Sequence, residues 1–167
     1  MIAGKKISLM QRQTMQNSLS VPQVGGIVKH MRFIFLTSFI VEILGALLLL
    51  PVFVSRYGMG GIWMSFFHSV SAFCNAGFDL MGNRTGKFSS LTSFADIGYV
   101  NLIFSLLIII GGIGFLTWND IVNKKMKIKQ YRMQSKVILL ASFILVSGAA
   151  LFFFFTEFYL HTIFFIF

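Results

Sequence analysis

Three long apolar runs dominate the chain. They cover residues 33–54, 100–118 and 137–155 and hold 22, 19 and 19 residues. A helix needs about 20 apolar residues to cross the hydrocarbon core of a bilayer. The first run carries one charge, Glu42, and the other two carry none. We therefore expect three transmembrane helices, and the fold class that this pattern predicts is an all-α membrane protein.

A shorter apolar segment lies between the first two runs, at about residues 61–73. Its aromatic residues have helical spacing, but a helix of this length extends only about 20 Å, which is too short to cross. The sequence CNAGFD then breaks the pattern. One interpretation is a re-entrant helix followed by irregular backbone, which must line a water-filled cavity or be covered by protein. The other is an interfacial helix or a folded outer loop.

The basic residues predict the orientation of the spans. Residues 1–32 contain five Lys or Arg and no acid, and residues 119–136 contain six and one acid. The segment between the first two spans has three basic residues and two acids. Basic loops stay on the cytoplasmic side of a membrane. We expect a multi-pass protein of the cell membrane with a cytoplasmic N-terminus, and the short apolar segment enters from outside.

The composition excludes several other classes. Hydrophobic residues make up 56% of the chain and charged residues 11%, which is far from the balance of a soluble domain. The net charge of +9 lies in blocks beside the apolar runs, so we expect no nucleic-acid partner. The single cysteine, Cys74, excludes an internal disulfide, and the three histidines lack metal-ligand spacing. No catalytic set is visible, so we expect no enzyme and no cofactor; a membrane enzyme is the rival class.

The residues after the short helix have the chemistry of a cation site. The carboxyl end of a re-entrant helix is the negative end of its dipole and favours cations. Backbone carbonyls of Asn75, Ala76, Gly77 and Phe78 can replace part of an ion's hydration shell, and hard oxygen ligands suit alkali cations. Glycine permits the strained torsions that this requires, and Asp79 would concentrate cations outside. The alternatives are a glycine that ends the helix and a solvated loop carboxylate.

A carboxylate and three glycines within the predicted spans each allow two interpretations. Glu42 lies within a predicted span, where a carboxylate is costly; it is either an ion-path group or a structural acid bonded to nearby backbone. Gly111, Gly112 and Gly114 either let helices pack closely or form a gating hinge.

The chain also contains an internal repeat. A shift of 104 residues aligns residues 31–50 with residues 135–154, and seven of the twenty positions are then identical, including a shared Ser-Phe-Ile. The third span therefore resembles the first, as if it opened a second copy of a span, short helix and span unit.

The motif SVSAFCNAGFDLMGN, followed by LIIIGGIGF and a basic segment, resembles the Trk/Ktr/HKT superfamily of potassium transporters, in particular the membrane subunit of bacterial Ktr uptake systems. In that superfamily four membrane-pore-membrane units surround one pore. The resemblance implies a basic cytoplasmic linker at 1–32 and the second unit at 33–118, with a pore helix at about 61–73 and a filter strand at 75–78. Residues 119–136 would be a cytoplasmic loop, and 137–167 the first helix of a following, incomplete unit.

The resemblance implies potassium uptake, with K⁺ as the transported ion held only by the filter carbonyls. It also implies partners: the lipid bilayer, the remaining pore repeats, a second copy in a homodimer and a cytoplasmic nucleotide-binding regulatory subunit. One filter strand cannot encircle an ion. We therefore expect a fragment of a longer protein, with assembly of several copies as the other explanation. A non-conducting accessory membrane subunit is the alternative function.

Overall fold

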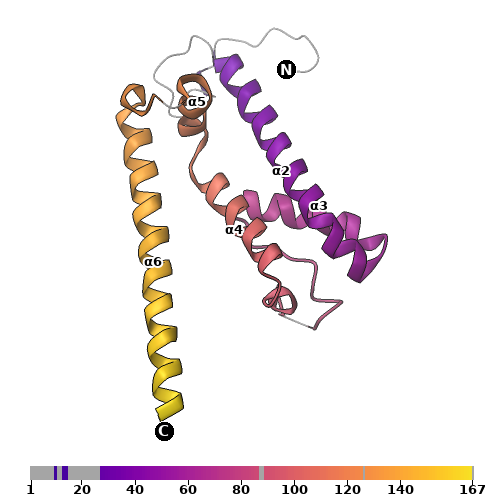
Figure 1. Cartoon of the computed structure of the whole chain (residues 1–167). Coiled ribbons are helices and arrows are strands. Elements are labelled where there is room, and N and C mark those ends of the chain that lie inside the picture. The colour runs from indigo at the N-terminus through magenta and orange to yellow at the C-terminus, as the bar shows by residue number, and fades with distance from the viewer. Residues whose placement is uncertain (1–9, 11–12, 15–26, 87–88, 126, 167) are drawn as a thin grey trace. The chain divides into compact units, whose positions relative to one another are not determined.

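The computed structural model describes residues 10, 13–14, 27–86, 89–125 and 127–166 (Figure 1). The chain divides into two compact units, residues 1–107 and 108–167. Every regular element within the described ranges is helical, so the predicted all-α class is confirmed for that part of the chain. The predicted linker at 1–32 lies mostly outside these ranges.

Helix α2, Ile27–Tyr57, contains the first predicted span. Its buried residues Ala46, Leu49 and Phe53 lie on one face. Other positions of α2 are equally apolar and are between 48 and 65% exposed: Phe35, Leu36, Phe39, Ile40, Leu44, Leu47 and Leu48. A helix that is apolar on all sides belongs in a protein core or a membrane. Residues Val28–Tyr57 are long and apolar enough to cross a bilayer.

Helix α6, Met133–Ile166, contains the third predicted span. Its stretch Met133–Thr156 is also long and apolar enough to cross a membrane, and none of its most apolar window is buried within the structure. Large side chains such as Phe143, Leu145 and Phe153 are between 66 and 72% exposed. Two apolar candidate spans therefore support a membrane location for the chain.

The second predicted span differs from the expectation of one helix over 100–118. Helix α4 covers Gly98–Gly112, and a separate helix, α5, covers Phe115–Lys124 at 94° to it. The break falls at Gly114, whose φ of 84° no helix can contain. The indole Nε1–H of Trp118 donates to the Ile110 carbonyl at 3.0 Å, which satisfies a carbonyl at the end of α4. Hydropathy indicates how long an apolar run is, but it does not indicate that the chain changes direction within the run.

Helix α3, Gly60–Phe73, folds back against α2 within the first unit (Figure 1). Two glycines allow the close approach. A Cβ at Gly61 would collide with the Phe53 backbone carbonyl, and one at Gly45 would collide with the Ser69 hydroxyl. The Ser69 hydroxyl instead donates to the Glu42 carbonyl at 2.7 Å. Glycine contacts and a side-chain hydrogen bond therefore join the two helices, as is common in membrane proteins.

The core of the first unit lies where α2 and α3 meet the start of α4 and the short helix η1, Thr92–Phe94. Phe53 stacks on Phe94 with ring centroids 4.8 Å apart and on His68 at 5.3 Å. The cluster buries Leu49, Phe53, Met64, Ala72, Met81, Phe94, Val100, Ile103 and Leu107. Met81 comes from the segment after α3, so this core also holds the chain just beyond the candidate filter.

Gly61→Ala tests the close contact between α2 and α3. We expect it to lower the free energy of unfolding by roughly 1–3 kcal/mol, because the new methyl group meets rigid backbone at Phe53. Gly98→Ala is the matched control, since Gly98 also begins a helix and a Cβ there meets nothing within 4 Å. Thermal unfolding of the purified chain in detergent measures both. Equal melting temperatures for the two variants would contradict the packing described.

Candidate functional site

The end of α3 has the hydrogen bonds of a Schellman motif. The Asn75 N–H donates to the Ala72 carbonyl at 3.0 Å, and the Ala76 N–H donates to the Ser71 carbonyl at 2.9 Å. These are the two bonds that close a helix around one left-handed residue. That residue is Asn75, with φ of 54°. The sequence offered Gly77 as the helix-ending residue, but Asn75 occupies that position.

Gly77 is a second left-handed residue, with φ of 72°, and it lies beyond the helix cap. A Cβ there would meet nothing within 4 Å, so no neighbour requires a glycine. The requirement is conformational, because a left-handed backbone costs other residues about 1–2 kcal/mol. The backbone from Asn75 to Phe78 therefore changes direction twice within four residues.

Two side chains of α3 hold the segment that follows Gly77. The Ser71 hydroxyl donates to the Phe78 carbonyl at 2.7 Å. The Leu80 N–H donates to Nε2 of His68 at 3.3 Å. Ser71 and His68 are three positions apart and lie on one helix face. Helix α3 therefore holds the following segment by hydrogen bonds at Phe78 and Leu80, the two neighbours of Asp79.

His68 is fixed on several sides. It is 1% exposed, and its Nδ1 contacts the Met64 carbonyl at 2.7 Å. Because Nε2 accepts from Leu80, Nδ1 must carry the proton, and the ring is the neutral tautomer. No role was expected for His68 from the sequence, where only its spacing of three residues from Ser71 places both on one helix face. In the structure His68 joins the α2 core, through Phe53, to the segment after the candidate filter.

Asp79 and Glu42 have local partners of different kinds. An Asp79 carboxylate oxygen accepts the Met81 N–H at 2.7 Å, which stabilises the turn after Phe78. Glu42 is bonded through its backbone carbonyl, which accepts from Ser69. Within the described ranges no ion pair reaches the Glu42 side chain. Arg56, a basic residue near the end of α2, donates to the Ser93 carbonyl at 2.9 Å and lies over the Phe94 ring.

The predicted filter segment is open to its surroundings. Residues 74–78 are all exposed, and the Phe78 side chain is 70% exposed. Helical hydrogen bonds do not continue past the cap, and lipid cannot supply partners to irregular backbone. In a membrane this segment therefore needs protein or water against it.

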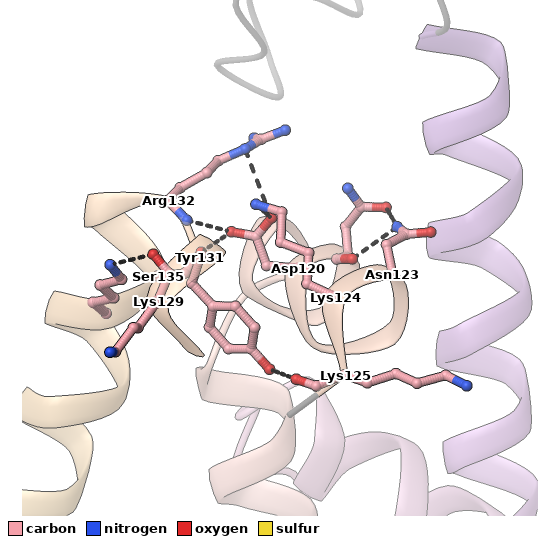
Figure 2. A network of polar contacts seen from close by, with 10 residues as sticks. Asp120, Asn123, Lys124, Lys125, Lys129, Tyr131, Arg132 and Ser135 are labelled. Carbon is pink, nitrogen blue, oxygen red and sulfur yellow. Dashed lines mark hydrogen bonds and ion pairs between the residues drawn. The ribbon is translucent and has the colours of Figure 1, made fainter. Parts of the chain in front are cut away.

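A separate polar network lies in the second unit, around Asp120 of α5 (Figure 2). Its carboxylate accepts from the Arg132 N–H at 3.0 Å and from the Ser135 hydroxyl at 2.7 Å, and it pairs with Lys124 at 2.8 Å. Arg132 directly precedes α6, so this carboxylate caps that helix from another element. This role was not expected from the sequence, although Asp120 is the one acid in residues 119–136.

The surroundings of Asp120 favour its charged form. Burial raises the pKa of this carboxyl, but hydrogen bonds from Lys124, the Arg132 N–H and Ser135, with the charge of Lys124, outweigh burial and lower the pKa to about 2. A carboxyl whose pKa is lowered by folding stabilises the protein above its unfolded pKa, about 3.9. That contribution is lost as the pH falls through the folded value.

The regular elements of the described residues are all helical, two of them are apolar candidate spans, and an anchored, irregular segment follows a short helix. These are features of a membrane transport protein. The chain belongs to the TrkH family, described as cation transport proteins, whose model matches residues 1–167. This family comprises transporters and not enzymes.

Two relatives illustrate the membership. The potassium/sodium uptake protein NtpJ of Enterococcus hirae is 38% identical over 157 residues, which are 93% of this chain and 33% of the relative. The Ktr system potassium uptake protein B of Bacillus subtilis is 36% identical over 159 residues, 95% of this chain and 34% of the relative. The chain spans about a third of the length of these relatives.

His68→Phe tests the anchor behind Phe78. The substitution keeps a ring against Phe53 but leaves the Leu80 N–H without its acceptor, a loss that costs roughly 1–3 kcal/mol locally. We expect amide hydrogen exchange of residues 78–81 to become about tenfold faster or more. His30→Phe, at the start of α2, is the control. Unchanged exchange in His68→Phe would show that this anchor does not hold the segment.

Asp120→Asn tests the cap of α6. At pH 7 we expect a loss of roughly 1–2 kcal/mol, because Asn cannot pair with Lys124 as a carboxylate does. The wild-type chain should lose a similar amount between pH 5 and pH 2, and the variant should lose less. Asp96→Asn, at an exposed position, should behave as wild type in thermal unfolding. A wild-type melting temperature that falls no more than that of Asp120→Asn would contradict the assignment.

Proposed function

We propose that this chain contributes a selectivity-filter strand, residues 75–78, to a pore that conducts K⁺ down its electrochemical gradient. In this proposal residues 33–118 form one membrane-pore-membrane unit, with α3 as the re-entrant pore helix. Residues 137–167 begin a further unit. The relatives' names describe potassium or potassium/sodium uptake, which supports K⁺ as the transported ion.

The observation that carries the proposal is the left-handed Gly77 beyond a completed helix cap. A glycine that only ended α3 would stand where Asn75 stands. Left-handed residues at 75 and 77 turn successive peptide planes, which is what a short strand needs to direct several carbonyls to one side. The exposure of residues 74–78 leaves that side accessible to an ion.

The hydrogen bonds distinguish the carbonyls that can bind an ion from the one that anchors the strand. The Phe78 carbonyl accepts from Ser71, so we assign it to anchoring. The carbonyls of Asn75, Ala76 and Gly77 are then the principal ion ligands. The carboxyl end of α3 points its dipole toward the same segment and adds negative potential. Asp79 lies directly after it and would attract cations to the outer mouth.

The pore requires more than this strand, because the carbonyls of one strand meet an ion from one side only. The other strands come from further units of a longer polypeptide or from other copies of the chain. With the N-terminus in the cytoplasm, residues 119–136 would lie on the inner side, where a nucleotide-binding regulatory subunit could dock. Glu42 stays a candidate ion-path group, and the break at Gly114 a candidate gating hinge.

Gly77→Ser tests the filter directly. Gly58→Ser is the matched control, because Gly58 has a similar φ of 60° and a Cβ there also meets nothing within 4 Å. We expect Gly77→Ser to reduce K⁺ uptake, or its preference over Na⁺, by roughly tenfold, as 1–3 kcal/mol of backbone strain implies. Gly58→Ser should retain both properties. Growth in limiting K⁺ and rubidium uptake, in a bacterial strain without its own K⁺ uptake systems, provide the measurement.

Each variant is expressed both as this chain alone and within its complete coding sequence. Rescue by the complete sequence alone would mean that the strand needs partners from the same polypeptide. Rescue by the chain alone would mean that copies assemble around one axis. If Gly77→Ser and Gly58→Ser behave alike in the form that rescues growth, the filter assignment is wrong.

A further inference from the structure

Residues 119–125 and 127–136, which run from the second half of α5 into the first turn of α6, form a basic elbow. We use that name for these residues, which include the short helix η2, Ile128–Gln130. Its single acid, Asp120, is 2% exposed and is already paired with Lys124, with Arg132 Nε 3.9 Å away. The negative charge is therefore buried and neutralised, and what the elbow presents outward is positive.

Four lysines of the elbow are exposed: Lys125, Lys127, Lys129 and Lys136. Among the described residues no carboxylate pairs with any of them. The Lys136 ammonium donates to the Lys129 carbonyl at 2.9 Å, which uses one of its three donors. These lysines carry positive charge that no carboxylate of the described residues offsets, so the elbow favours a ligand that carries negative charge.

Exposed apolar side chains lie among these lysines. Val122, Ile128 and Met133 are 51, 60 and 82% exposed. A purely electrostatic surface for an acidic soluble protein does not need them. Basic and large apolar residues on one short segment are typical of peptides that lie in a membrane interface, with lysines among headgroups and apolar side chains at the acyl boundary.

The position of the elbow in the chain sets its depth. The candidate span of α6 begins at Met133, and Lys136 lies within its first turn. Lys129 lies four residues before that helix. If α6 crosses the bilayer, the lysines are at headgroup level, because charged groups at the end of a span extend their ammonium groups to the interface.

Hydrogen bonds tie described parts of the elbow to one another. The Tyr131 hydroxyl donates to the Lys125 carbonyl, and the Asp120 carboxylate holds Arg132 and Ser135 (Figure 2). Lys125 has φ of 48°, a backbone conformation that residues other than glycine rarely adopt. A loop held in one conformation loses less entropy when it binds than a mobile one does.

We propose that the basic elbow is a binding surface for the phosphate headgroups of anionic phospholipids. Lys125, Lys127 and Lys129 supply the charge, and Ile128 and Met133 insert beside the acyl chains. This surface is distinct from the filter segment and does not depend on ion conduction. A lipid bound here would brace the start of α6 against the membrane surface, next to the Asp120 cap.

The test measures lipid binding to the full chain by native mass spectrometry in a nonionic detergent. Phosphatidylglycerol is added in one series and phosphatidylcholine with the same acyl chains in the other. We expect the wild type to retain phosphatidylglycerol preferentially. A triple substitution, Lys125→Gln, Lys127→Gln and Lys129→Gln, should weaken retention on the order of tenfold to a hundredfold. The corresponding Lys→Arg triple variant should retain it.

Circular dichroism of each variant checks that the helices remain, which exposed substitutions should not disturb. Adding Ile128→Ser to the wild type should reduce retention of both lipids, because it removes the apolar contact. Equal retention of the two lipids by wild type would overturn the proposal and leave the lysines to an acidic protein surface. Unchanged phosphatidylglycerol binding in the Gln triple variant would overturn it as well.

Discussion

The close contact between α2 and α3 is the interaction on which the rest of the first unit depends. Gly45 and Gly61 let the backbones approach, and the Ser69 hydroxyl bonds across to the Glu42 carbonyl. Once α3 is held there, its residues His68 and Ser71 bind the segment after Gly77. The placement of the candidate filter therefore depends on two glycines that lie well before it in the chain.

Much of the fold follows from apolar length. The runs at 33–54 and 137–155 lie inside α2 and α6, and a helix occurs where the short apolar segment predicts one. The run at 100–118 shows the limit of that reasoning. Its glycines were visible in the sequence, but nothing in the pattern indicates that Gly114 adopts a left-handed conformation and ends the helix. Where the helix ends depends on the backbone torsion of Gly114, and the apolar character of the run does not indicate that torsion.

The candidate site was predictable in outline. The residue types from Asn75 to Phe78 indicated carbonyl chemistry, and glycine indicated strained backbone. The division of roles required coordinates, because a helix cap at Asn75 and a carbonyl bond at Phe78 depend on where α3 stops. His68 and Asp120 were missed for a related reason. Each acts through groups distant in sequence, Leu80 and Ser135, and a single sequence does not reveal such pairs.

The most direct test of the central claim is to locate the ion itself. Anomalous X-ray scattering from crystals of the assembled protein, grown in Rb⁺ in place of K⁺, would show which oxygens surround the cation. The account predicts a rubidium peak beside the carbonyls of Asn75, Ala76 and Gly77, with the Phe78 carbonyl still bonded to Ser71. Rubidium bound elsewhere, with none at this segment, would contradict it.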